Sequence, residues 1–176
     1  MTADAMAGRI PLEAVFGRRL EIIQPTENDV LAVGLRYVET AEPTAKATLT
    51  ALATTGWTAI IVSGGYRQAI RPLAEALGIA RIEAVDLQFD REGRYTGYDP
   101  AFPTTRSHGK PEIIRRLRAE LRPARIVMVG DGMTDLETKP VVDLFVGFGR
   151  YSVQEKVKQG AAAFIMSLDA LIGLLR

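Results

Sequence analysis

The chain of 176 residues contains no cysteine and only one histidine, His108. Without cysteine it can form no disulfide framework and no thiolate metal site, and it has no thiol nucleophile. A single histidine also excludes any metal site with two histidine ligands inside this chain.

The sequence also lacks a strong charge of either sign and any long apolar run. A formal net charge of +1 gives no indication of a polyanionic partner. Glu112 and Glu120 accompany the arginines between residues 115 and 125, which favours a solvated helix face over a nucleic-acid surface. No apolar run reaches transmembrane length, and the first residues do not have the basic-then-apolar order of a signal peptide. We expect a cytoplasmic protein without nucleic-acid or membrane partners.

Residues 1–42 have a helical pattern. Two apolar stripes with helical spacing lie on either side of Gln24-Pro25, where proline ends the first helix. Thr26 is placed as an N-cap, and Asp29 answers it as in a capping box. We expect these two helices to form a hairpin.

From residue 43 onward, short apolar runs alternate with helical segments. Buried strands are expected at 58–62, 125–130, 143–146 and 162–165, and a hairpin at 90–98. The helices between them are bounded by Gly56, Gly78 and Pro123. Strands separated by helices indicate a parallel sheet with helices on both faces, that is, an α/β fold.

The most informative stretch is Ile126–Glu137. Four apolar residues run directly into Gly130-Asp131-Gly132, and a second carboxylate follows at Asp135. Two glycines around an aspartate permit a tight turn in which the backbone approaches a ligand closely. A carboxylate at the end of a buried strand, next to a helix N-terminus, suits a hard cation and a phosphate together.

Two other places have features suited to phosphate. Ser63-Gly64-Gly65 follows a strand and supplies a hydroxyl and backbone N–H groups. Taken alone, it fits an ordinary glycine turn equally well. Lys110 lies in the first turn of a helix, where the helix dipole disfavours a cation. It is either a phosphate ligand or a solvated lysine.

Together these segments resemble the phosphoserine phosphatases of the haloacid dehalogenase superfamily. The resemblance covers nearly the whole chain and is carried by residues 5–8, 19–25, 60–66, 86–98, 109–114, 128–135 and 145–149. It implies a helical cap at 1–42, N-terminally incomplete, and an α/β core at 43–176. It also implies hydrolysis of O-phosphoserine, the last step of serine biosynthesis, with Mg²⁺ as cofactor.

The resemblance implies a role for each matching residue. Ser63, Gly64, Gly65 and Lys110 would bind the phosphate, and Asp131 and Asp135 the metal. Met6, Ala7, Arg19 and Thr134 would contact the rest of the substrate. Ala7 stands where the family often has glycine. The guanidinium of Arg19 suits a carboxylate, which it can bind with two hydrogen bonds. Trp57 and Tyr66 are expected to pack, and His108 to line the turn before Lys110.

The family's nucleophile is the piece that this sequence does not contain. These enzymes carry two aspartates, nucleophile and acid/base, as Asp-x-Asp after a first strand, and no Asp-x-Asp occurs here. In the family that strand lies centrally, between the strands that carry Ser63 and Asp131. We therefore expect the chain alone to be inactive and destabilised. It should either leave an open slot in its sheet or draw its two half-sheets together.

Three hypotheses remain from the sequence. The chain is a fragment, or starts at a misplaced codon, of a phosphoserine phosphatase. Alternatively, it is a degenerate relative that binds phosphate or a phosphoamino acid without catalysis. The third hypothesis is a phosphatase of the same superfamily that acts on another phosphomonoester.

Overall fold

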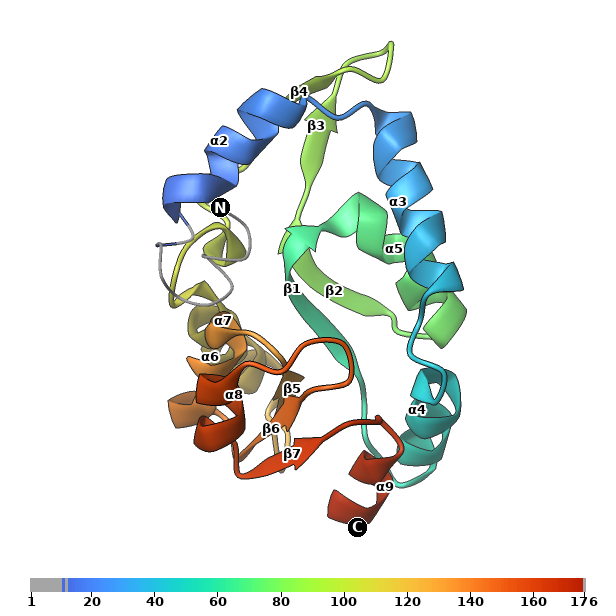
Figure 1. The fold of residues 1–176 in the computed structure, drawn as a ribbon, viewed down its shortest axis with the longest axis vertical. Coiled ribbons are helices and arrows are strands. Elements are labelled where there is room, and N and C mark those ends of the chain that lie inside the picture. Colours follow the sequence, from blue (N-terminus) through green and yellow to red (C-terminus); the bar gives the residue numbers. More distant parts are fainter. Residues whose placement is uncertain (1–10, 12, 176) are drawn as a thin grey trace.

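The computed structural model describes residue 11 and residues 13–175, and Figure 1 shows their arrangement. The N-terminal part holds α2 (Glu13–Ile23), α3 (Glu27–Glu39), α4 (Ala45–Thr54), β1 (Ile60–Tyr66), α5 (Arg67–Leu77) and β2 (Arg81–Val85). The middle part holds β3 (Leu87–Phe89), β4 (Tyr95–Tyr98), the 3₁₀ turn η1 (Pro103–Thr105) and α6 (Gly109–Leu121). The last part holds β5 (Val127–Gly130), α7 (Met133–Leu136), η2 (Lys139–Val141), β6 (Leu144–Phe148), α8 (Glu155–Gly160), β7 (Ala163–Ile165) and α9 (Ala170–Leu174).

The parallel strands form two separate half-sheets. β1 pairs with β2, and β5, β6 and β7 form a three-stranded sheet in that order, with every pairing parallel. β3 and β4 form the expected antiparallel hairpin. The predicted α/β architecture is confirmed. Among the described residues, no hydrogen-bonded ladder joins β1 to β5.

An open cleft separates the two half-sheets. A cavity of about 810 Å³ lies between β1 and β5 and is closed on one side by α4 and α9. All seven residues of β1 are partly exposed, although the strand begins with Ile-Ile-Val. The central residues of β6, which has a partner on each side, are buried. Of the two outcomes expected from the sequence, the structure therefore has the open slot.

The N-terminal helices do not form the expected hairpin. The capping box of Thr26 and Asp29 is confirmed, but α2 and α3 diverge from it in Figure 1. α2 packs through Phe16, whose ring centroid lies 6.0 Å from that of Tyr66 and 5.2 Å from that of Tyr98. α3 lies on α5 at Gly34, where a Cβ atom would come within 2.9 Å of the Ala69 carbonyl oxygen.

Most of the other expected elements are present, with boundaries shifted by a few residues. β1 is the informative exception because it continues through Ser63-Gly64-Gly65 to Tyr66, where a turn was expected. Tyr66 still pairs with Val85 of β2 after an irregularity in the register. Trp57 and Tyr66 pack against apolar clusters, as expected. In the described part of the chain, no helix is both long and apolar enough to cross a bilayer.

Gly109, the first residue of α6, has no room for a side chain. A Cβ atom there would lie 1.6 Å from the carbonyl oxygen of Pro103 in η1, so the backbone would have to move. We expect Gly109→Ala to lower the free energy of unfolding by about 2 kcal/mol or more, as overpacking does. Gly173→Ala is the matched control, because nothing lies within 4 Å of its Cβ position. Urea unfolding measures both, and equal effects would contradict this account.

Candidate functional site

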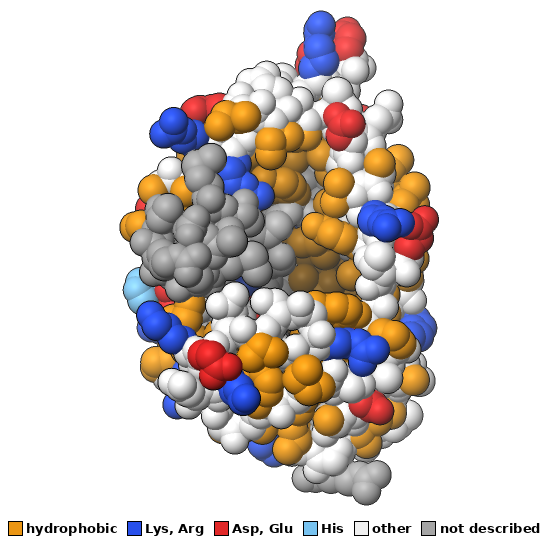
Figure 2. All heavy atoms as spheres, in the orientation of Figure 1, with side chains coloured by type: hydrophobic (Ala, Val, Ile, Leu, Met, Phe, Trp, Pro, Cys, Tyr) orange, Lys and Arg blue, Asp and Glu red, His pale blue; other side chains and the backbone are white. Residues whose placement is uncertain are grey.

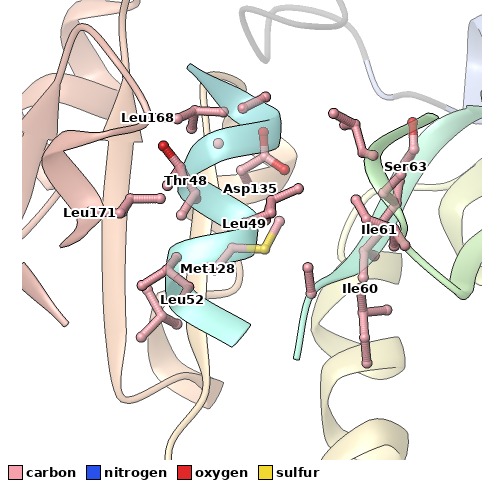
Figure 3. A pocket seen from close by; sticks show the side chains of 18 of the residues that line it. Thr48, Leu49, Leu52, Ile60, Ile61, Ser63, Met128, Asp135, Leu168 and Leu171 are labelled. Carbon is pink, nitrogen blue, oxygen red and sulfur yellow. The ribbon is translucent and has the colours of Figure 1, made fainter. Parts of the chain in front are cut away.

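Three segments far apart in the sequence meet at the carboxyl end of the cleft. Ser63 and Gly65 come from β1, Lys110 from the first turn of α6, and Asp131 and Asp135 from the segment after β5, and all five line the cavity. Figure 3 shows Ser63 and Asp135 on opposite sides of it. The structure thus brings these predicted residues together, and their roles remain predictions.

The centre of this cluster is an ion pair between Lys110 and Asp135. The Lys110 Nζ atom lies 2.6 Å from Asp135 Oδ1, and the two side chains are only 12% and 8% exposed. The other carboxylate oxygen of Asp135 accepts the Gly132 backbone N–H at 3.0 Å. Lys110, which the helix dipole disfavours, is thus stabilised by a carboxylate of the same site.

Gly130 makes room for this carboxylate. A Cβ atom at Gly130 would lie 2.3 Å from Asp135 Cγ, so any side chain there would push Asp135 away from the end of β5. The sequence indicated that this glycine permits a close approach. The structure identifies Asp135, a residue of the same loop, as the group that approaches.

Asp131 is the second carboxylate of the site. Burial raises its pKa, the negative charge of Asp135 raises it further, and Lys110 opposes both effects. Lys110 is paired with Asp135 and only partly offsets the charge of Asp131, so a divalent cation would relieve the repulsion that remains. Among the described residues, no group of three or more histidine, cysteine, aspartate or glutamate side chains is placed to hold a metal ion. The donor set fits Mg²⁺, which is commonly bound by one or two carboxylates and otherwise by water and substrate phosphate.

The Ser63 segment is already hydrogen-bonded within itself. Ser63 Oγ accepts the backbone N–H of Gly65 at 3.0 Å, so one expected phosphate donor is occupied. Gly64 does not line the cavity, and its Cβ position faces the Thr104 carbonyl oxygen at 3.6 Å. A phosphate bound here would have to replace the Ser63–Gly65 bond or use the serine hydroxyl as a donor.

The residues expected to contact the rest of the substrate are less closely connected to the cavity. Arg19 of α2 is half-buried and lies close enough to Tyr66 for its charge to lower the pKa of that phenol, against burial, which raises it. Neither Arg19 nor Thr134 lines the cavity. Met6 and Ala7 lie outside the described residues.

Two carboxylates hold the loop that precedes Lys110, and the sequence did not reveal them. Glu13 of α2 accepts both the backbone N–H and the hydroxyl of Ser107 at 3.0 Å. On the other side, Glu137 accepts the His108 N–H at 2.7 Å. His108 has a left-handed backbone with φ of 59° and occupies the N-cap position of α6, in the turn where it was expected. α2 is thereby fastened directly to the Lys110 loop.

Comparison with known proteins identifies relatives over nearly the whole chain. The family model for haloacid dehalogenase-like hydrolases matches residues 5–138. Phosphoserine phosphatase of Bos taurus is 33% identical over 177 residues, which cover 99% of this chain and 79% of that protein. The Homo sapiens phosphoserine phosphatase is 32% identical with the same coverage.

Solved structures show the same architecture. A phosphoserine phosphohydrolase-like protein from Francisella tularensis matches with a TM-score of 0.87 and 24% identity, covering 99% of this chain and 82% of that one. A substrate-bound phosphoserine phosphatase complex matches with a TM-score of 0.81 and 22% identity, covering 99% of this chain and 81% of that one. These likenesses establish the fold.

Removal of Lys110 should leave Asp135 buried without its cation. We expect Lys110→Met to lower the free energy of unfolding by about 3 kcal/mol, as broken buried ion pairs do. In the double variant Lys110→Met/Asp135→Asn no charge is left unpaired between these two positions. Its loss should therefore be smaller than the sum of the single losses. Urea unfolding of the four proteins tests this, and additive losses would mean that the two residues are not coupled.

The contact of Glu13 with Ser107 should control the mobility of α2. We expect Glu13→Ala to speed amide exchange in α2 and in residues 106–109, whereas Glu21→Ala, on the same helix, should not. The hydrogen bond to the Ser107 N–H lowers the pKa of Glu13. Its stabilisation is therefore complete above the pKa of the unfolded chain, and it is lost as the pH falls through the lowered pKa. The difference in amide exchange rate between Glu13→Ala and the parent should shrink as the pH falls through the lowered pKa of Glu13. A pH-independent difference would contradict the assignment.

Proposed function

Because this chain belongs to the family of haloacid dehalogenase-like hydrolases, we propose that its site serves the hydrolysis of a phosphate monoester, O-phosphoserine, once a nucleophile is supplied to it. The observation that carries the proposal is the meeting of Ser63, Lys110, Asp131 and Asp135 around one cavity. The choice of phosphoserine as substrate rests on the relatives, which are named phosphoserine phosphatases. Hydrolysis of phosphoserine would make this protein the last enzyme of serine biosynthesis.

Each residue of the cluster has a part in this chemistry. The Ser63 hydroxyl and the Lys110 ammonium group would hold the phosphate, since both can donate hydrogen bonds to its oxygen atoms. Asp131 and Asp135 would hold Mg²⁺, which when bound would offset negative charge on the phosphoryl group. Arg19 would bind the carboxylate of the serine moiety. The ion pair of Lys110 with Asp135 positions the lysine before any substrate arrives.

Covalent transfer requires a nucleophile. The resemblance to the family assigns that role to none of the five residues described above, Ser63, Gly65, Lys110, Asp131 and Asp135. In the family an aspartate attacks the phosphorus and the alcohol leaves, which gives an aspartyl phosphate that water then hydrolyses. The strand that would carry this aspartate belongs in the cleft between β1 and β5. We propose that turnover depends on such a strand and that this chain alone does not hydrolyse phosphoserine.

The alternative is a protein that binds a phosphorylated ligand without turnover. It is favoured by one observation, the absence of Asp-x-Asp from all 176 residues. The lysine and the two carboxylates would serve binding equally well. The two functions therefore differ only in what happens when a nucleophile is supplied.

A chimera tests the proposal. The N-terminal segment of a phosphoserine phosphatase, through the strand with its two aspartates, is joined before Met1. We expect Mg²⁺-dependent phosphate release from phosphoserine. In Lys110→Ala the kcat should fall by a factor of about 100 or more. A chimera whose nucleophile is changed to asparagine should be inactive.

The outcomes separate the three hypotheses. If the chimera releases phosphate faster from another phosphomonoester than from phosphoserine, that ester and not phosphoserine would be the substrate. A folded chimera that binds phosphoserine and releases no phosphate from any of the esters would favour the binding protein.

A further inference from the structure

We propose that Glu137 is a positioning residue for Lys110. Its carboxylate would hold the backbone of the turn before Lys110, so that the lysine stays beside the two aspartates of the site when a phosphate binds. The inference rests on the proposed function, because it concerns how the site keeps its phosphate-binding lysine in place. Neither the local sequence nor the resemblance to the family assigned a role to Glu137.

Two connections join α7 to the start of the neighbouring helix α6 (Figure 1). The first is the ion pair between Lys110 Nζ and Asp135 Oδ1 at 2.6 Å. The second is the hydrogen bond from the His108 backbone N–H to Glu137 Oε2 at 2.7 Å. Asp135 and Glu137 are two residues apart, and so are His108 and Lys110. The two connections thus link the same two short segments, and groups in one such network are expected to strengthen each other.

A bound phosphate would affect these two connections differently. Lys110 and Asp135 both line the cavity of the site, where a phosphate would compete with Asp135 for the hydrogen-bond donors of the lysine. His108 and Glu137 do not line that cavity and instead line a separate recess. The bond between them therefore stays intact when the cavity is filled. It can keep the start of α6 against α7 while the ion pair loosens.

Glu137 lies on a backbone that is fixed on both sides of it. The preceding residue, Leu136, is so close to α8 that a Cβ atom at Gly160 would lie 2.7 Å from its Cδ1 atom. The following residue, Thr138, is fully buried, and its hydroxyl donates to the Asp135 carbonyl oxygen at 2.6 Å. A carboxylate on a rigid support positions the group that it binds more precisely than one on a mobile loop does.

His108 contributes its backbone to this contact and not its imidazole. The side chain is 80% exposed, and Nδ1 lies 3.8 Å from Glu137 Oε2, which is beyond hydrogen-bonding distance. Figure 2 shows the only histidine of the chain (pale blue) at the surface. Its left-handed backbone, with φ of 59°, is a conformation that asparagine also tolerates. The proposal therefore requires the Glu137 carboxylate and predicts that the imidazole can be replaced.

The experiment measures how fast each lysine amine of the 176-residue protein is acylated, with mass spectrometry as the readout. We expect Lys110 to react about 10-fold faster in Glu137→Ala than in the parent, the effect of losing one hydrogen bond to a charged group. In Glu137→Gln the rise should be about 3-fold, because a neutral amide oxygen still accepts the N–H but more weakly. Lys46 is the internal reference, since its Nζ atom donates to the Ala76 carbonyl oxygen at 2.8 Å, and its rate should not change.

Two further variants are matched controls. Glu112→Ala removes a carboxylate from the same turn of α6, where it pairs with Arg106 at 2.6 Å on the exposed surface. His108→Asn removes the imidazole and keeps the backbone N–H. Both should leave the acylation rate of Lys110 within about 2-fold of the parent, as expected for exposed charged groups.

The chimera adds a kinetic measurement. Glu137→Ala should lower its kcat/KM for phosphoserine by about 10-fold and Glu137→Gln by about 3-fold, whereas His108→Asn should not lower it. Acylation requires no nucleophile in the protein, so it tests Glu137 even if the chimera is inactive. An inactive chimera together with faster acylation of Lys110 would reject the proposed function and leave the role of Glu137 standing.

Three results would overturn the proposal. The first is an unchanged acylation rate of Lys110 in Glu137→Ala and Glu137→Gln. The second is an increase at Lys46 as large as that at Lys110 in the folded variants, which would indicate general loosening. The third is an effect of His108→Asn as large as that of Glu137→Ala, which would assign the contact to the imidazole. If Glu137→Ala does not fold, Glu137→Gln decides between these outcomes.

Discussion

The inner edges of β1 and β5 are the constraint on which the rest of the structure depends. A parallel strand buried among helices normally has a hydrogen-bonding partner on each side, whereas β1 and β5, which face the same cavity, each have a partner on one side only among the described residues. A buried backbone group without a partner costs about 1–3 kcal/mol, whereas a whole domain is stable by about 5–15 kcal/mol. The open cleft keeps these groups accessible and leaves β1 partly exposed.

The site at the end of the cleft is organised independently of the gap. Lys110 of α6 and Asp135 of α7 both line the cavity and are already paired at 2.6 Å. Gly130 allows the carboxylate to lie against β5, and Glu13 and Glu137 hold the loop before Lys110. The polar cluster is therefore in place although the sheet beneath it is divided.

The sequence predicted the parts of this structure that depend on local signals. The capping box at Thr26, the left-handed Gly78 that ends α5 and the hairpin between β3 and β4 are each specified by a few neighbouring residues. The strands with aliphatic runs were placed for the same reason.

The predictions that failed depend on partners distant in the sequence. The expected hairpin of α2 and α3 was wrong because an apolar stripe does not say which surface it will cover. Gly34 lets α3 lie on α5 instead. β1 continues past its glycines because Tyr66 pairs with Val85, a contact that no local pattern announces. Likewise, the pairing of Lys110 with Asp135, 25 residues later, and the contact of Glu13 with Ser107 arise from tertiary packing.

The open cleft and the polar cluster have one geometric relation that follows from the parallel sheet. Parallel strands all end at the same edge of their sheet, so a strand between β1 and β5 would deliver its last residues to the space bordered by Ser63, Lys110 and Asp131. A reactive side chain on that strand would be fixed by backbone hydrogen bonds on both sides. Such positioning by rigid neighbours is what group transfer requires. Restoring the continuity of the sheet and completing the chemistry would then be the same event.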